Sequence, residues 1–99
     1  MSEFNHGFAI TVEQALKEAG YSVFFDWRKE PGPRATKFMA ERTVDGHRGI
    51  TCVISHVDYW SYTLIWFPGT VEDRAYGRFD SAPELVATLN AAWRGVKSH

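Results

Sequence analysis

Two adjacent segments, 50–56 and 60–66, constrain the fold most strongly, because large apolar and small polar residues alternate through both. A three-residue loop at 57–59 pairs His56 with Trp60 and gathers the larger apolar side chains on one face. That face consists of Ile50, Cys52, Ile54, His56, Trp60, Tyr62, Leu64 and Trp66. The other face is rich in Ser and Thr and consists of Thr51, Val53, Ser55, Ser61, Thr63 and Ile65. The pattern predicts an antiparallel hairpin whose apolar face is covered by another layer.

Two more strands are predicted before this hairpin. The segment 21–28 has apolar residues at alternate positions, which is typical of a strand. These positions are Tyr21, Val23, Phe25 and Trp27. Two prolines in 29–34 end that strand, since proline cannot donate to a strand ladder. The next strand is predicted at 35–44.

The strand at 35–44 and the one that begins near residue 50 are joined by a turn containing Asp45-Gly46, a strong hairpin signal. A two-residue loop would place Ile50 opposite Glu41. A three-residue loop at 44–46 places Ile50 opposite Ala40 and keeps apolar residues on one face. We therefore predict the three-residue loop.

A helix is predicted at 12–19, before the strands. Thr11 is a suitable N-cap residue, and Gln14 completes a capping box. Gly20 supplies the C-terminal stop. Residues 1–9 lack helical periodicity and are predicted to be a flexible tail.

A second helix is predicted after the strands. Ser81 is its N-cap residue, Glu84 completes a capping box, and Gly95 marks its end. Its apolar face consists of Leu85, Val86, Leu89, Ala92, Trp93 and Val96. Residues 97–99 are predicted to be a second flexible tail.

The predicted element order is α-β-β-β-β-(β)-α, in which the bracketed strand is a short edge strand near 75–79. This order indicates an α+β fold of two layers, with a four- to five-stranded antiparallel meander and both helices packed on one face. At 99 residues, the chain fits one domain with one core, covering 1–99.

Charge and cysteine content narrow the function classes. Eleven basic and twelve acidic residues give a net charge of −1, which disfavours a strongly basic nucleic-acid binder and an acidic DNA mimic. A single cysteine excludes an intramolecular disulfide and fits a reducing compartment. Residues 1–10 contain no basic run before an apolar stretch, and the most apolar run, 63–67, is far shorter than the ~20 residues of a membrane span. We therefore expect a cytoplasmic protein with no membrane association.

The sequence contains no recognisable catalytic arrangement. Cys52 and His56 share a strand face, but four residues of strand separate them by ~13 Å, too far for a nucleophile and its base. The four histidines show no metal-ligand spacing, and no phosphate-binding glycine motif is present. We therefore predict a non-catalytic protein with no catalytic residue, no cofactor and no metal site.

The leading functional hypothesis is protein binding. The chain is rich in aromatic residues, and some of them fall outside the predicted core faces, close to arginines. Tyr and Arg dominate the energetics of protein interfaces. The predicted partner-binding residues are Tyr59, Phe67, Arg74, Tyr76 and Arg78. We expect one of two partners. The chain is either a small accessory or inhibitor protein, of the phage or mobile-element type, that acts on a larger assembly, or it binds a second copy of itself in a homodimer.

A nucleic-acid-binding module is the alternative hypothesis. Basic residues outnumber acidic ones by three between 28 and 48, and aromatic residues could stack on unpaired bases. The predicted contacts for this alternative are Arg28, Lys29, Arg34 and Lys37. The same charges could simply solvate a sheet edge and discourage aggregation. A small enzyme of unknown class is the third hypothesis.

Overall fold

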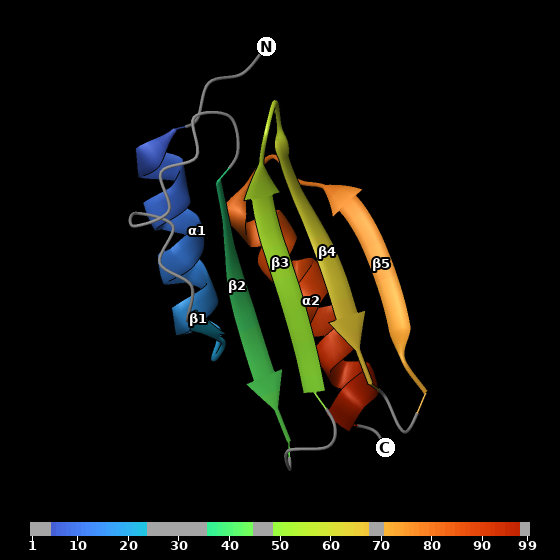
Figure 1. The fold of residues 1–99 in the computed structure, drawn as a ribbon. Coiled ribbons are helices and arrows are strands. Elements are labelled where there is room, and N and C mark those ends of the chain that lie inside the picture. Colours follow the sequence, from blue (N-terminus) through green and yellow to red (C-terminus); the bar gives the residue numbers. More distant parts are fainter. Residues whose placement is uncertain (1–4, 24–35, 45–48, 68–70, 98–99) are drawn as a thin grey trace.

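The structure is a computed structural model that describes residues 5–23, 36–44, 49–67 and 71–97. Its elements are α1 (His6–Glu18), β1 (Ser22–Val23), β2 (Thr36–Thr43), β3 (Gly49–His56), β4 (Trp60–Trp66), β5 (Asp73–Arg78) and α2 (Ala82–Lys97). The strands form one antiparallel sheet in the order β1-β2-β3-β4-β5. In Figure 1, α2 runs across the back of the sheet and α1 lies at its β1–β2 end, where it packs against α2 and β1. The predicted α+β meander is confirmed, and the optional edge strand exists as β5.

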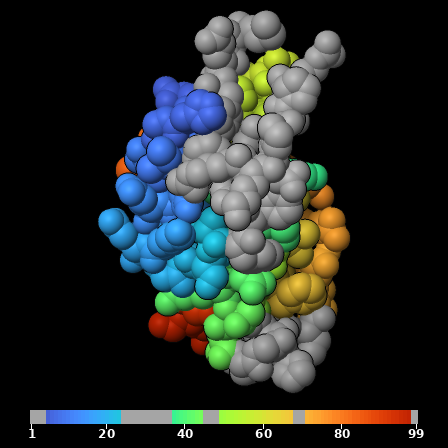
Figure 2. Space-filling model, turned by 60° about the vertical axis from the view of Figure 1, so that its left-hand side comes forward, coloured from blue at the N-terminus to red at the C-terminus, as the bar shows by residue number. Residues whose placement is uncertain are grey.

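The core lies between the helices and the even-numbered side chains of β2, β3 and β4. Its fully buried members include Val12, Leu16, Phe38, Cys52, Ile54, Leu64, Leu85 and Leu89. Trp60, Tyr62 and Trp66 are partly buried and pack against this cluster, so their predicted inward orientation is confirmed. Phe8 of α1 also reaches this face, since its ring centroid lies 5.3 Å from that of Trp60. Figure 2 shows the outer face of α1 at the surface, on the side away from β5.

The pairing of β3 with β4 agrees with the sequence prediction. His56 lies opposite Trp60 and Ile50 lies opposite Trp66, as the three-residue loop requires. The predicted pairing of β2 with β3 is wrong by two residues. Ile50 lies opposite Arg42 instead of Ala40, and Thr43 lies opposite Gly49, so five residues separate the paired ends.

The physical reason for the register error is the two-residue period of a strand. A shift of two residues leaves every side chain on its original face, so face polarity cannot distinguish the two registers. A close contact at Gly49 fits the observed register. A Cβ atom at this position would lie 2.6 Å from the backbone oxygen of Arg42, so the pairing favours glycine opposite Thr43.

The start predicted for the first helix is wrong, because α1 begins at His6 instead of residue 12. Asn5 is the N-cap residue, and its side-chain oxygen accepts a hydrogen bond from the backbone N–H of Phe8 at 3.0 Å. Thr11 lies inside the helix, where its hydroxyl donates to the carbonyl oxygen of Gly7 at 3.0 Å. Part of the segment expected to be a tail therefore forms helix and buries Ala9.

The predicted stop of the first helix at Gly20 is confirmed. Gly20 has a φ of 101°, in the left-handed region that glycine adopts without steric penalty. The backbone N–H of Tyr21 donates to the carbonyl of Leu16, and that of Gly20 donates to the carbonyl of Lys17. These two bonds form a Schellman motif, which turns the chain directly into β1.

The second helix begins as predicted and ends later. The backbone N–H of Glu84 donates to the Ser81 hydroxyl at 3.3 Å, which confirms the N-cap. The helix continues through Gly95 to Lys97, because glycine weakens a helix without having to end it. Of the strand predicted at 21–28, residues 22–23 form β1, Tyr21 precedes the strand, and residues 24–28 lie outside the described residues.

Candidate protein-binding surface

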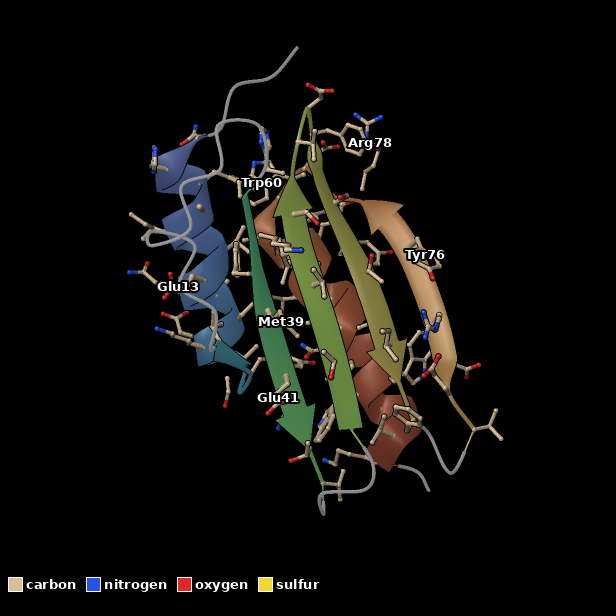
Figure 3. The ribbon with its side chains drawn as sticks, viewed as in Figure 1. Glu13, Met39, Glu41, Trp60, Tyr76 and Arg78 are labelled. Carbon is tan, nitrogen blue, oxygen red and sulfur yellow. The ribbon has the colours of Figure 1, made fainter. Side chains whose placement is uncertain are left out.

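The sheet face opposite the helices carries three rows of side chains that run across four strands. The middle row consists of Met39, Val53, Thr63 and Tyr76. A second row consists of Glu41, Thr51, Ile65 and Arg74, and a third consists of Lys37, Ser55, Ser61 and Arg78. We call these twelve residues the open face, because no helix of the described part of the chain covers them. Figure 3 shows Met39 and Glu41 on β2 and Tyr76 on β5, at the two sides of this face.

The most exposed part of the open face lies on β5. Arg74, Tyr76 and Arg78 occupy alternate positions there and project to the same side of the sheet. We call these three residues the β5 strip. The side chain of Tyr76 is 67% exposed, the largest value among the exposed aromatic residues of the described part of the chain. A rigid strand therefore presents an aromatic ring between two guanidinium groups.

Both arginines of the β5 strip are held by neighbouring side chains. The guanidinium carbon of Arg78 lies 3.9 Å from the ring centroid of Tyr59, a cation–π contact at the β3–β4 turn. The Nε of Arg74 donates to a carboxylate oxygen of Glu72. That hydrogen bond raises the pKa of Arg74 above its ordinary value, so the guanidinium remains charged. The strip is therefore partly preorganised.

The predicted partner-binding residues do not all come together. Arg74, Tyr76 and Arg78 form the β5 strip, and Tyr59 joins it through Arg78. Phe67 is partly buried and follows β4, at the end of the sheet away from Tyr59. Its backbone N–H donates to the carbonyl of Gly49 at 2.9 Å, which extends the pairing of β3 with β4.

Two parts of this surface were not among the predicted partner-binding residues. The first is Glu72, which positions Arg74. Both residues were predicted to lie in a loop, where a spacing of two residues does not indicate a contact. The open face also includes apolar residues of the central strands, namely Met39, Val53 and Ile65. Their odd numbers, opposite in parity to the core positions, were the available signal.

The residues predicted for nucleic-acid contact are only partly described. Lys37 is exposed and lies at the start of β2, on the open face. Arg28, Lys29 and Arg34 lie outside the described residues. A nucleic-acid role thus stays a prediction.

Arg42 belongs to the same basic stretch of sequence but has a structural role. It projects toward the helices, with its guanidinium carbon 4.3 Å from the Trp93 ring centroid. Its Nη1 donates to the carbonyl oxygen of Ala19 at 3.2 Å. Arg42 therefore connects the end of α1 with α2, and its even number placed it on the core side of β2.

The cysteine is buried in the core. Cys52 has no exposed surface and lies between Ala40 and Leu64 in the sheet. Burial raises the pKa of the Cys52 thiol to about 12, so it is protonated at neutral pH and is a poor nucleophile. His56, which follows Cys52 by four residues on β3, is also buried and packs against the ring of Trp60.

Two further features of the described residues concern ligands and membranes. Within residues 5–23, 36–44, 49–67 and 71–97, His, Cys, Asp and Glu side chains form no group of three that could hold a metal ion. Neither described helix combines the length and the apolar character that a membrane span requires. Comparison with known proteins found no matching family model, no matching curated protein and no matching solved structure.

Proposed function

We propose that the protein is a non-catalytic protein-binding module whose β5 strip contacts another protein. That protein is either a larger assembly, on which this chain acts as an accessory or inhibitor-like protein, or a second copy of the chain. The observation that carries this proposal is the exposure of Tyr76 between Arg74 and Arg78 on a strand at the sheet edge. Tyr offers a large, rigid contact area, and Arg offers forked hydrogen bonds and stacking. The three side chains share one direction, so a partner can contact all of them at once.

The neighbouring open face supports the proposal. The row that contains Tyr76 continues through Thr63 and Val53 to Met39. This row provides apolar contact area beside the polar strip, which resembles the apolar core and polar rim of protein interfaces. Met39 is also adaptable in shape, which suits a contact surface.

The test is capture of partners from a native cell extract on the immobilised protein. The variant Arg74→Ala with Tyr76→Ala should reduce capture at least about tenfold, because two interface anchors are removed. Arg94→Ala, on the exposed side of α2, removes one arginine on the other side of the sheet and should leave capture unchanged. Circular dichroism of both variants should match that of the parent. Equal capture by the parent and the double variant would contradict the proposal.

A further inference from the structure

β5 has one side of its backbone directed away from the sheet. Among the described strands it pairs with β4 only, and the six consecutive pairs leave no bulge. The backbone N–H of Phe79 donates to the carbonyl of Trp60, which fixes the phase of the hydrogen bonds. In an antiparallel ladder the hydrogen-bonded positions alternate, so Asp73, Ala75 and Gly77 bond toward β4. The N–H and C=O groups of the β5 strip point outward, as on a template for another strand.

We propose that this edge binds the β5 strand of a second copy of the chain, antiparallel, about a two-fold axis at Ala75. The inference rests on the proposed protein-binding function and names a partner for the same surface. The five strands of each copy would then continue into one sheet, with all helices on one side and both open faces on the other.

The side-chain charges select this register. With Ala75 opposite Ala75 of the second copy, Glu72 of each copy lies opposite Arg78 of the other. Arg74 of each copy likewise lies opposite Tyr76 of the other. The dimer thus gains two ion pairs and two cation–π contacts across the junction, all on the open face.

The neighbouring registers are electrostatically unfavourable. After a shift by one residue, positions that point away from β4 in one copy would lie opposite positions that bond to β4 in the other. Only shifts by two residues therefore preserve the hydrogen bonds between the copies. A shift by two in one direction places Arg74 opposite Arg78 of the second copy. A shift by two in the other direction places the two Arg74 residues opposite each other. Like charges directly opposite each other destabilise strand pairing, so both shifts are disfavoured.

On the helix side, β5 itself carries mostly small side chains. The side chains there belong to Asp73, Ala75 and Gly77, of which two are small. In the proposed register Asp73 lies opposite Gly77 of the second copy, and the two Ala75 residues face each other. Side chains at these positions stand perpendicular to the sheet, so they do not lie between the two backbones.

The test is analytical ultracentrifugation of the full chain over a concentration series, with a charge-exchange cycle. The parent should show a concentration-dependent monomer–dimer equilibrium. Glu72→Arg alone and Arg78→Glu alone should each weaken dimerisation roughly tenfold, since each creates two like-charge pairs. The double variant Glu72→Arg with Arg78→Glu should recover most of the parent affinity.

Glu18→Arg is the matched control for this experiment. It makes the same charge change at an exposed position of α1, on the side of the molecule away from β5, and should not alter dimerisation. Thermal unfolding should show that every variant folds. A parent that is monomeric throughout, single variants that dimerise as well as the parent, or a double variant without recovery would each overturn the proposal. If a monomeric parent still captures partners through Arg74 and Tyr76, the second-copy inference fails while the proposed function stands.

Discussion

At the scale of single residues, the two-residue period of a strand decides which side chains are buried. Even-numbered positions of β2, β3 and β4 face the helices, so Cys52 lies in the core. The same rule applies to Arg42, but its charge suggested a solvent-exposed role. Its aromatic and carbonyl partners come from residues 19, 21 and 93, which the sequence pattern does not connect.

The thiol of Cys52 should make stability depend on alkaline pH. Its pKa is about 12 in the folded state and 9.0 ordinarily, so its contribution is fully present below pH 9 and lost as the pH rises through 12. At pH 10 the loss is about 1.4 kcal/mol, because unfolded chains ionise first. The stability difference between the parent and Cys52→Ala, measured by urea unfolding at pH 7 and pH 10, should shrink by that amount. A difference that stays constant would contradict the burial of the thiol.

At the scale of elements, local signals were sufficient where the connection was short. For β3 and β4, the three-residue loop predicted at 57–59 gives the observed register. The β2–β3 connection allows two registers with identical faces, and backbone contacts at Gly49 instead favour the longer loop. The start of α1 was missed because Asn5 and Thr11 are both good N-cap residues, and burial of Ala9 favours the earlier one.

Two glycine-to-alanine substitutions should have opposite effects on stability. Gly49→Ala places a Cβ atom 2.6 Å from the Arg42 backbone oxygen, so we expect a loss of ~1–3 kcal/mol from overpacking. Gly95→Ala meets no atom within 4 Å and lies in α2, so we expect a gain of ~0.5–1 kcal/mol from helix propensity. Urea unfolding of the parent and both variants provides the comparison. If Gly49→Ala were as stable as the parent, the observed β2–β3 register would be wrong.

At the scale of the whole molecule, the fold class follows from the order of periodicities, because strands bounded by amphipathic helices have few packing solutions. The candidate surface could be predicted only in part. If 73–78 is a strand, the side chains of residues 74, 76 and 78 project to the same side of the sheet. The contacts of Arg78 with Tyr59 and of Arg74 with Glu72 depend on the three-dimensional structure. The charge pairing proposed between two copies also depends on which β5 residues hydrogen-bond to β4, and the bond from Phe79 to Trp60 determines this.

Side-chain contacts of Arg42 and Tyr21 join the two helices to the sheet. Arg42 of β2 stacks on Trp93 of α2 and donates to Ala19 at the end of α1. The Tyr21 hydroxyl donates to the side-chain oxygen of Asn90 at 3.0 Å, close to the same junction. These contacts link elements that are distant in sequence, so we expect their loss to loosen α1 against α2 more than the β3–β4 hairpin.

Arg42→Met tests this junction, because methionine keeps much of the apolar stem and removes the charge. We expect a loss of ~1–3 kcal/mol, from a partly desolvated cation–π contact and a hydrogen bond to a helix carbonyl. Arg78→Met is the matched control, since Arg78 also stacks on an aromatic ring but is exposed, and its loss in dilute solution should be about 0.5 kcal/mol. Hydrogen exchange should accelerate at the backbone amides of residues 19–21 in Arg42→Met, while the β3–β4 amides keep the protection expected from the change in global stability. Equal unfolding free energies for the two variants, with unchanged exchange at 19–21, would show that Arg42 does not hold the helices together.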